Sequence, residues 1–163
     1  MEPVKPQKEH LWLKQILGKW KVTFECAMGP DQPTAAFEGV ETVQSIGEIW
    51  FIARGENQTP CSDGDQAGNS MMTLGYDTAK GYYVGSFVCS MMNWMWQYHD
   101  GQLDDAGKIL TLKTTGPLCT GEGLAEYEDA MEIIDTDHRV LRSRMKMPDG
   151  SWQQIMQGKY QRI

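Results

Sequence analysis

Apolar and polar residues alternate with a period of two along most of the chain. The alternation is clear where Trp20, Val22 and Phe24 are separated by Lys21 and Thr23. Such a period places successive side chains on opposite faces of an extended strand, so residues 20–28 are predicted to form a half-buried β-strand. Turn-forming residues divide the rest into similar segments, and further strands are predicted near residues 35–46, 49–55, 71–76, 82–89, 94–103, 108–115, 126–134, 139–147 and 152–161.

One segment near the N-terminus has a different period. Leu13, Ile16 and Leu17 are spaced as on one face of a helix, Pro6 can begin that helix, and Gly18 can end it. The sequence therefore predicts a flexible segment over residues 1–6, a helix over 7–17, and a single β-domain over 19–163.

Many short strands joined by short turns favour an antiparallel meander. Closure into a barrel removes the exposed sheet edges that such a meander would otherwise have. A two-sheet sandwich is the alternative, and it needs long crossing connections, for which only residues 57–69 and 116–123 are long enough. We therefore predict an all-β fold, a single up-and-down antiparallel barrel of about ten strands, with the short helix closing one end.

Charge and composition limit the class of partner. The chain has 22 acidic and 15 basic residues, a net charge of -7, and no Lys/Arg-rich run, which argues against nucleic acid as a partner. It has no apolar run of about 18 residues and no signal-peptide pattern, so we expect a cytoplasmic protein with no membrane partner. The cysteines Cys26, Cys61, Cys89 and Cys119 are widely separated, so we predict reduced thiols, no metal site and no cofactor.

The two ends of the predicted barrel resemble those of the calycins, which include the lipocalins and the fatty-acid-binding proteins. Leu17-Gly18-Lys19-Trp20 is similar to their opening signature, a short helix followed by Gly-x-Trp on the first strand. In that family the Trp closes one barrel end beneath a basic residue of the last strand, and Arg162 matches this residue. The resemblance implies that Gly18, Trp20 and Arg162 close one end of a calycin-like barrel.

A second resemblance covers most of the chain. Glu9-His10, Gly39-x-Glu41, Gly75-Tyr76-Asp77, Asp105-x-Gly107-Lys108 and Asp149-Gly150 follow one another as in a bacterial family catalogued as domain of unknown function 1579. The usual Trp-x-Asp-Ser-Met of this calycin-like family is here Phe87-Val88-Cys89-Ser90-Met91, which lacks the carboxylate. The family has no assigned activity, so this resemblance supports the fold and implies no reaction.

Histidines and acidic residues are the candidates for catalysis. None of His10, His99 and His138 accompanies a nucleophile in a local motif, so no catalytic residue is predicted. We expect His10 and His138 to be surface or capping residues, and His99 either a rim residue, which we favour, or a group facing a cavity. The acidic groups at Asp104-Asp105, at Glu126 with Glu128-Asp129, and at Asp135 with Asp137 are predicted to be solvated.

Glu41 is different because it lies between Val40 and Thr42 within a predicted strand. An inward carboxylate needs a partner to offset the free energy of desolvation. Arg54, on the next predicted strand, is the expected partner.

Residues 91–99 form the segment richest in aromatic and sulfur-containing side chains. One face of the predicted strand carries Trp94, Trp96 and Tyr98, and the other carries Met95, Gln97 and His99. The aromatic face is typical of ordinary core, of a pocket wall, or of a contact with a second copy of the chain in a homodimer. Because a barrel of about ten strands is wider than one that side chains alone can fill, we predict an internal pocket.

The sequence therefore predicts a protein that binds a small hydrophobic or amphipathic molecule inside the barrel. The expected ligand-binding residues are Phe24, Glu41, Arg54, Phe87, Cys89, Trp94, Trp96 and Tyr98. One alternative is an isomerase or hydrolase with His99 or Glu41 as its base. The other is a haem binder, as in the nitrobindin branch of the calycins. It ranks last because residues 158–162 contain no histidine to serve as an axial ligand.

Overall fold

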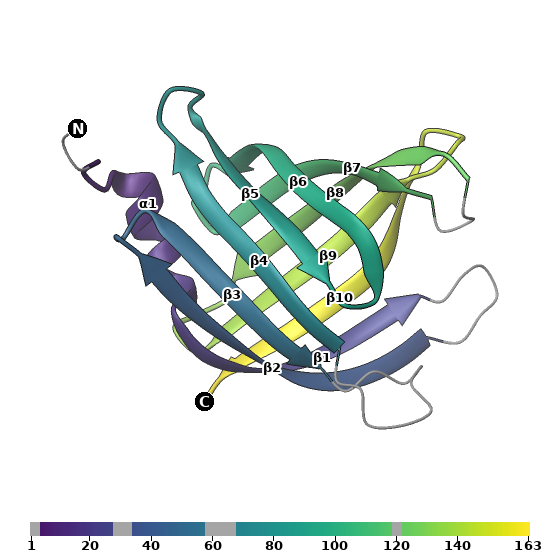
Figure 1. Ribbon diagram of the computed structural model, residues 1–163, viewed down its shortest axis with the longest axis horizontal. Helices are drawn as coiled ribbons and strands as arrows, with labels where there is room; N and C mark the ends of the chain where they lie inside the picture. Colours follow the sequence, from purple (N-terminus) through teal and green to yellow (C-terminus); the bar gives the residue numbers. More distant parts are fainter. Residues whose placement is uncertain (1–3, 28–33, 58–67, 119–121) are drawn as a thin grey trace.

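Ten strands follow one another around a closed antiparallel barrel (Figure 1). The computed structural model describes residues 4–27, 34–57, 68–118 and 122–163. The strands are β1 (Gly18–Ala27), β2 (Thr34–Ile46), β3 (Trp50–Asn57), β4 (Gly68–Asp77), β5 (Tyr82–Cys89), β6 (Met92–Leu103), β7 (Ile109–Pro117), β8 (Leu124–Ile133), β9 (His138–Lys146) and β10 (Trp152–Arg162). Each strand pairs with its neighbour in sequence, and β1 pairs with β10. The predicted up-and-down barrel is confirmed.

Alternation along the strands sorts side chains between the interior and the solvent. On β1, Trp20 and Val22 are buried, whereas Lys19 and Lys21 are exposed. On β6, Tyr98 is buried and Trp94 and Trp96 are partly buried, whereas Met95, Gln97 and His99 are exposed. The aromatic face of residues 94–98 is therefore the inner face, where a second copy of the chain could not reach it.

The helical segment lies across one end of the barrel (Figure 1) and is shorter than predicted. It consists of α1 (Lys8–Leu13) and a 3₁₀ turn (Lys14–Ile16). Trp12 Nε1 donates a hydrogen bond of 2.7 Å to the Gly107 carbonyl, and Tyr83 Oη donates one of 3.1 Å to the Glu9 carbonyl. These bonds fix the helix to the β6–β7 turn and to β5.

His10 is a capping residue, as expected, but it is buried. Its Nδ1 accepts a hydrogen bond of 3.0 Å from the Gln7 backbone N–H, and its ring meets Tyr76 edge-on at 5.8 Å. His138 is exposed and hydrogen-bonds Asp135 in the β8–β9 turn, as expected for a surface capping residue. Both histidines therefore have structural partners.

Trp20 and Arg162 close the helical end of the barrel. Trp20 is 1% exposed, and its Nε1 donates a hydrogen bond of 2.8 Å to the Ile16 carbonyl. The Arg162 guanidinium lies 4.1 Å from the Trp20 ring and also donates to the Leu17 carbonyl. Gly18 has a φ of +109°, and a Cβ there would lie 2.8 Å from Arg162 Nη1, so glycine suits this position. Gly18, Trp20 and Arg162 therefore lie together at the helical end of the barrel.

The opposite end of the barrel carries the ends of β1 and β3 and the starts of β2 and β4 (Figure 1). The long loop predicted over residues 57–69 falls largely outside the described residues, as do Cys61 and Cys119. Cys26 and Cys89 are free thiols. In the part of the chain that the structure describes, no helix has the length and apolar character needed to cross a membrane.

Candidate functional site

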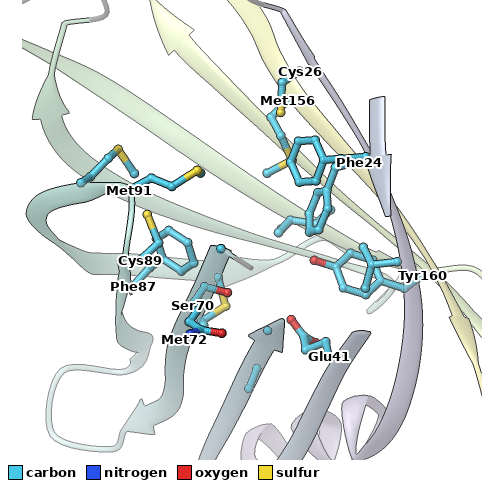
Figure 2. A pocket seen from close by; sticks show the side chains of 18 residues that line it. Phe24, Cys26, Glu41, Ser70, Met72, Phe87, Cys89, Met91, Met156 and Tyr160 are labelled. Carbon is cyan, nitrogen blue, oxygen red and sulfur yellow. The ribbon is translucent and has the colours of Figure 1, made fainter. Parts of the chain in front are cut away.

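A cavity of about 210 Å³ lies inside the barrel toward the end opposite α1 (Figure 2). We call it the outer cavity. Phe24 and Phe87 form apolar walls on opposite sides, with Met156 beside Phe24 and Met72 on the side of Phe87. Cys26, Cys89 and Met91 lie toward its mouth, and Figure 2 shows several sulfur atoms around the cavity. Its surface is therefore mostly hydrocarbon and sulfur.

A second space of about 180 Å³, the inner cavity, adjoins the first. The two share the side chains of Met72, Phe87, Met92, Leu141 and Met156 as common walls. Aromatic residues from two strands, Trp96 and Tyr98 of β6 and Tyr127 of β8, line the inner cavity, together with the polar residues Thr114, Asp129 and Ser143. The barrel thus holds two adjoining spaces with mostly apolar walls, and each has one carboxylate, Glu41 in the outer cavity and Asp129 in the inner one.

Glu41 lines the outer cavity and forms an ion pair with Arg139 from β9. Arg139 is only 2% exposed, and its guanidinium lies 3.8 Å from the Tyr160 ring and 4.7 Å from the Trp20 ring. The planar cation is therefore held between aromatic rings with its charge matched by Glu41. The prediction that Arg54 is the partner of Glu41 is wrong, because Arg54 is exposed on the outer face of β3.

Tyr160 presents its hydroxyl to the outer cavity beside the Glu41 carboxylate (Figure 2). Burial, with a further contribution from the negative charge of Glu41, raises the pKa of Tyr160 well above its ordinary value. The phenol is therefore neutral at physiological pH and can donate a hydrogen bond. Glu41 and Tyr160, together with Ser70 and Asn69, form the polar part of this cavity.

Asp129 lies in the inner cavity and accepts a hydrogen bond of 2.5 Å from Tyr98 Oη. Burial raises the pKa of Asp129 above its ordinary value, and hydrogen bonds from Ser143 and Tyr98 act in the opposite direction without cancelling the effect of burial. Burial and the adjacent Asp129 charge also raise the pKa of Tyr98. The prediction that Asp129 is solvated is therefore wrong, because the inner face of β8 carries it into the barrel.

Some buried polar atoms have no hydrogen-bond partner among the described residues. They are Trp94 Nε1, Trp96 Nε1, Thr114 Oγ1 and Arg139 Nε. Trp96 and Thr114 line the inner cavity. Since buried polar groups are normally hydrogen-bonded, these two residues indicate that the inner cavity suits a polar group of a bound molecule.

A model of the family described as "Protein of unknown function (DUF1579)" matches residues 5–162. The chain belongs to the DUF1579 family. No curated protein matches the sequence. The family assignment confirms the resemblance seen in the sequence, whereas the relation to the calycins stays a prediction.

One solved structure supports the fold of this DUF1579 protein. The crystal structure of Rv2717c from M. tuberculosis is 12% identical, covers 98% of this chain and 99% of its own, and has a TM-score of 0.67. Two designed barrels are also similar. A redesigned β-barrel is 12% identical over 92% of this chain and 93% of its own, with a TM-score of 0.48. A de novo designed fluorescence-activating β-barrel is 15% identical over 92% and 95%, with a TM-score of 0.47.

The residues predicted to bind a ligand fall into separate groups in the DUF1579 barrel. Phe24, Glu41, Phe87 and Cys89 line the outer cavity, and Phe87, Trp96 and Tyr98 line the inner one. Trp94 is partly buried but lines neither cavity, and Arg54 lies outside the barrel. His99 is exposed on the outer face of β6, so it does not face a cavity as base or haem ligand.

Sequence reasoning missed several lining residues of this DUF1579 protein. Asp129 could have been found, because Tyr127 and Met131 lie two residues to either side and are buried in the same barrel. Arg139 and Ser143 are likewise buried on the inner face of β9. Within the described residues, no group of three or more His, Cys, Asp and Glu side chains is placed to hold a metal ion.

Proposed function

We propose that the barrel binds a small, partly apolar molecule in the outer and inner cavities. The observation that carries this proposal is the size and character of the space. Protein interiors are close-packed, with few voids larger than a water molecule, which occupies about 30 Å³ in the liquid. The outer cavity alone has about 210 Å³ and adjoins a second of about 180 Å³. Together they exceed the lower limit for ligand pockets of proteins, which is about 300 Å³.

The walls of the outer cavity suit an apolar group of irregular shape. Met72, Met92 and Met156 adapt to a ligand because the methionine side chain is unbranched and its sulfur is polarisable. Phe24 and Phe87 add flat apolar faces. Glu41 gives this cavity an acceptor and Tyr160 gives it a donor, and both would orient the polar end of the molecule.

The mouth of the outer cavity is also apolar. Met91 is 61% exposed and Met92 is 41% exposed, and both line the cavity. Exposed apolar side chains beside an apolar cavity favour the approach of a hydrophobic molecule from water. The position of these methionines therefore supports entry at the end opposite α1.

Ligand binding is favoured over the alternative of an isomerase or hydrolase that uses His99 or Glu41 as its base. Of the two bases considered, His99 lies on the outer face of the barrel, and Glu41 is held in an ion pair by Arg139. A general base must reach the proton that it removes, and the Glu41 carboxylate is already occupied by the Arg139 guanidinium.

The proposal can be tested with 2-naphthylmethanol, a neutral probe with an apolar ring system and one hydroxyl. We expect it to bind the wild-type protein and to raise the melting temperature, because a ligand that binds only the folded state stabilises that state. Ala53→Leu places a larger side chain in the outer cavity, where Ala53 is a buried lining residue. It should weaken binding at least about tenfold in calorimetric titration, equivalent to losing about 1.4 kcal/mol.

Ala36→Leu is the matched control, because Ala36 is exposed on the neighbouring strand β2. It adds the same atoms outside the cavity and should leave probe affinity unchanged. The proposal fails if the probe does not bind, or if Ala36→Leu and Ala53→Leu weaken its binding equally.

A further inference from the structure

The inner cavity contains a carboxylate without a cation. Among the residues that the structure describes, Asp129 takes part in no ion pair and receives hydrogen bonds only from the neutral donors Tyr98 and Ser143. The buried arginine of the barrel, Arg139, is already paired with Glu41. The negative charge of an ionised Asp129 is therefore unmatched inside the protein.

An unmatched carboxylate in an apolar cavity destabilises the folded state. Removing an ionised carboxylate from water is costly unless a cation or several hydrogen bonds replace the lost hydration. Burial accordingly raises the pKa of Asp129. Acidic residues with a shifted pKa that lie in a cavity are more often found at functional sites than elsewhere, so Asp129 is a candidate binding residue.

Aromatic rings surround the same space. Trp96 meets Tyr127 edge-on with their centroids 4.8 Å apart, and Phe87 and Tyr98 complete the aromatic lining. Gly116 makes room for Trp96, since a Cβ at this position would lie 2.0 Å from the indole ring. Aromatic ring faces carry partial negative charge and attract cations, most strongly where water is excluded.

Thr114 adds a hydrogen-bond acceptor. Its side chain lines the inner cavity, the residue is only 3% exposed, and its Oγ1 has no partner among the described residues. Asp129, Thr114 and Ser143 thus offer oxygen atoms from three neighbouring strands. An alkylammonium group has N–H donors for such oxygens and a positive charge for the carboxylate and the rings.

We propose that the inner cavity binds the ammonium group of a small apolar amine whose hydrocarbon part extends into the outer cavity. Asp129 supplies the counter-charge, Thr114 accepts a hydrogen bond, and the aromatic rings replace water around the cation. The inference rests on the proposed binding function and specifies the class of ligand. Trp96 Nε1 is a donor without a partner, so a hydroxyl or carboxylate in this cavity is the competing outcome that the experiment must distinguish.

The experiment compares three probes with the same ring system, 2-naphthylmethylamine, 2-naphthylmethanol and 2-naphthoate, by calorimetric titration at pH 7.5. We expect the amine to bind at least about tenfold more tightly than the alcohol, because a hydrogen bond to a charged group contributes about 1.5–3 kcal/mol, and tenfold in affinity equals about 1.4 kcal/mol. The carboxylate should bind most weakly, because the unmatched charge of Asp129 repels it.

Asp129→Asn keeps the size and one carbonyl oxygen of the side chain but removes its charge, and should abolish the preference for the amine. Glu126→Gln is the matched control, because it removes a charge of the same sign from the exposed face of the same strand. It should leave the preference intact. Thr114→Val, which removes one hydroxyl with little change of shape, should lower amine affinity more than alcohol affinity.

The inference is overturned if the wild-type protein binds the alcohol or the carboxylate as tightly as the amine, while the proposed binding function then still stands. It is also overturned if folded Asp129→Asn retains the preference for the amine. Failure of all three probes to bind overturns the binding function as well. The wild-type comparison needs no variant, so it decides the question even if Asp129→Asn does not fold.

Discussion

Glu41 and Asp129 both place a carboxylate inside the barrel, but only Glu41 has a cation beside it. Arg139 neutralises Glu41 within an aromatic enclosure. Asp129 has Tyr98 and Ser143 as hydrogen-bond donors and no cation among the described residues. At the residue scale the outer cavity therefore has a matched charge, and the inner cavity has a charge that a ligand can match.

Asp129→Asn should stabilise the free protein more at neutral pH than at acidic pH. Because burial raises the pKa of Asp129 in the folded state, its favourable contribution is present below its unfolded pKa, near 3.8, and is lost as pH rises through the folded value. Asparagine does not titrate. The melting temperature of the variant minus that of the wild-type protein should therefore increase from pH 4 to pH 8.

The groups that face Asp129 come from the strands around it. They are Tyr98 on β6, Thr114 on β7, Ser143 on β9 and Tyr160 on β10, with raised pKa values for both tyrosines. None of these side chains titrates between pH 4 and pH 8, so the pH dependence is assigned to Asp129. An equal difference in melting temperature at both ends of this range would contradict the assignment.

At the element scale, the alternation of apolar and polar residues along the strands made the fold predictable. The site was harder to predict, because the register between paired strands depends on the length of the turn that joins them. A two-residue turn after Ile46 would have set Arg54 opposite Glu41. The actual connection, residues 47–49, is one residue longer, so Glu41 lies opposite Gly55. A shift of one residue moves a side chain to the other face of the sheet, which places Arg54 in solvent. The sequence did not indicate this length unambiguously.

Contacts across the barrel could not be predicted from single strands. Glu41 on β2 meets Arg139 on β9, although β1 and β10 lie between these strands in the sheet. Such a pair depends on how the strands are staggered around the closed barrel. By contrast, the pairing of Trp20 with Arg162 was predicted from a family pattern, and the two residues are opposite each other on β1 and β10.

Trp20→Ala should destabilise the protein by about 3–5 kcal/mol, as is typical for a buried aromatic side chain. The substitution removes the ring that packs between the helical segment and the seam of β1 and β10, together with its bond to Ile16. Urea unfolding of both proteins measures the difference. Trp152→Ala is the control, because Trp152 is only partly buried and lies beside the exposed Arg144, and it should have a smaller effect. Equal effects would contradict the role of Trp20.

On the scale of the whole molecule, the two ends of the barrel differ in how their interior is filled. The end beneath α1 is filled by buried side chains such as Leu13, Ile16 and Trp20. The interior toward the other end holds the outer and inner cavities. Close packing at one end stabilises the barrel, and the cavities toward the other end are where we propose that a ligand binds. The net charge of -7 also favours the approach of a cation over that of an anion.

The most direct test of binding inside the barrel uses nuclear magnetic resonance of methionine methyl groups. Met72, Met92 and Met156 line both cavities, whereas the exposed Met71 and Met95 line neither. On titration with 2-naphthylmethylamine, we expect the signals of the first three to shift and those of Met71 and Met95 to stay in place. Shifts confined to Met71 or Met95, or no shifts at saturating probe, would contradict binding inside the barrel.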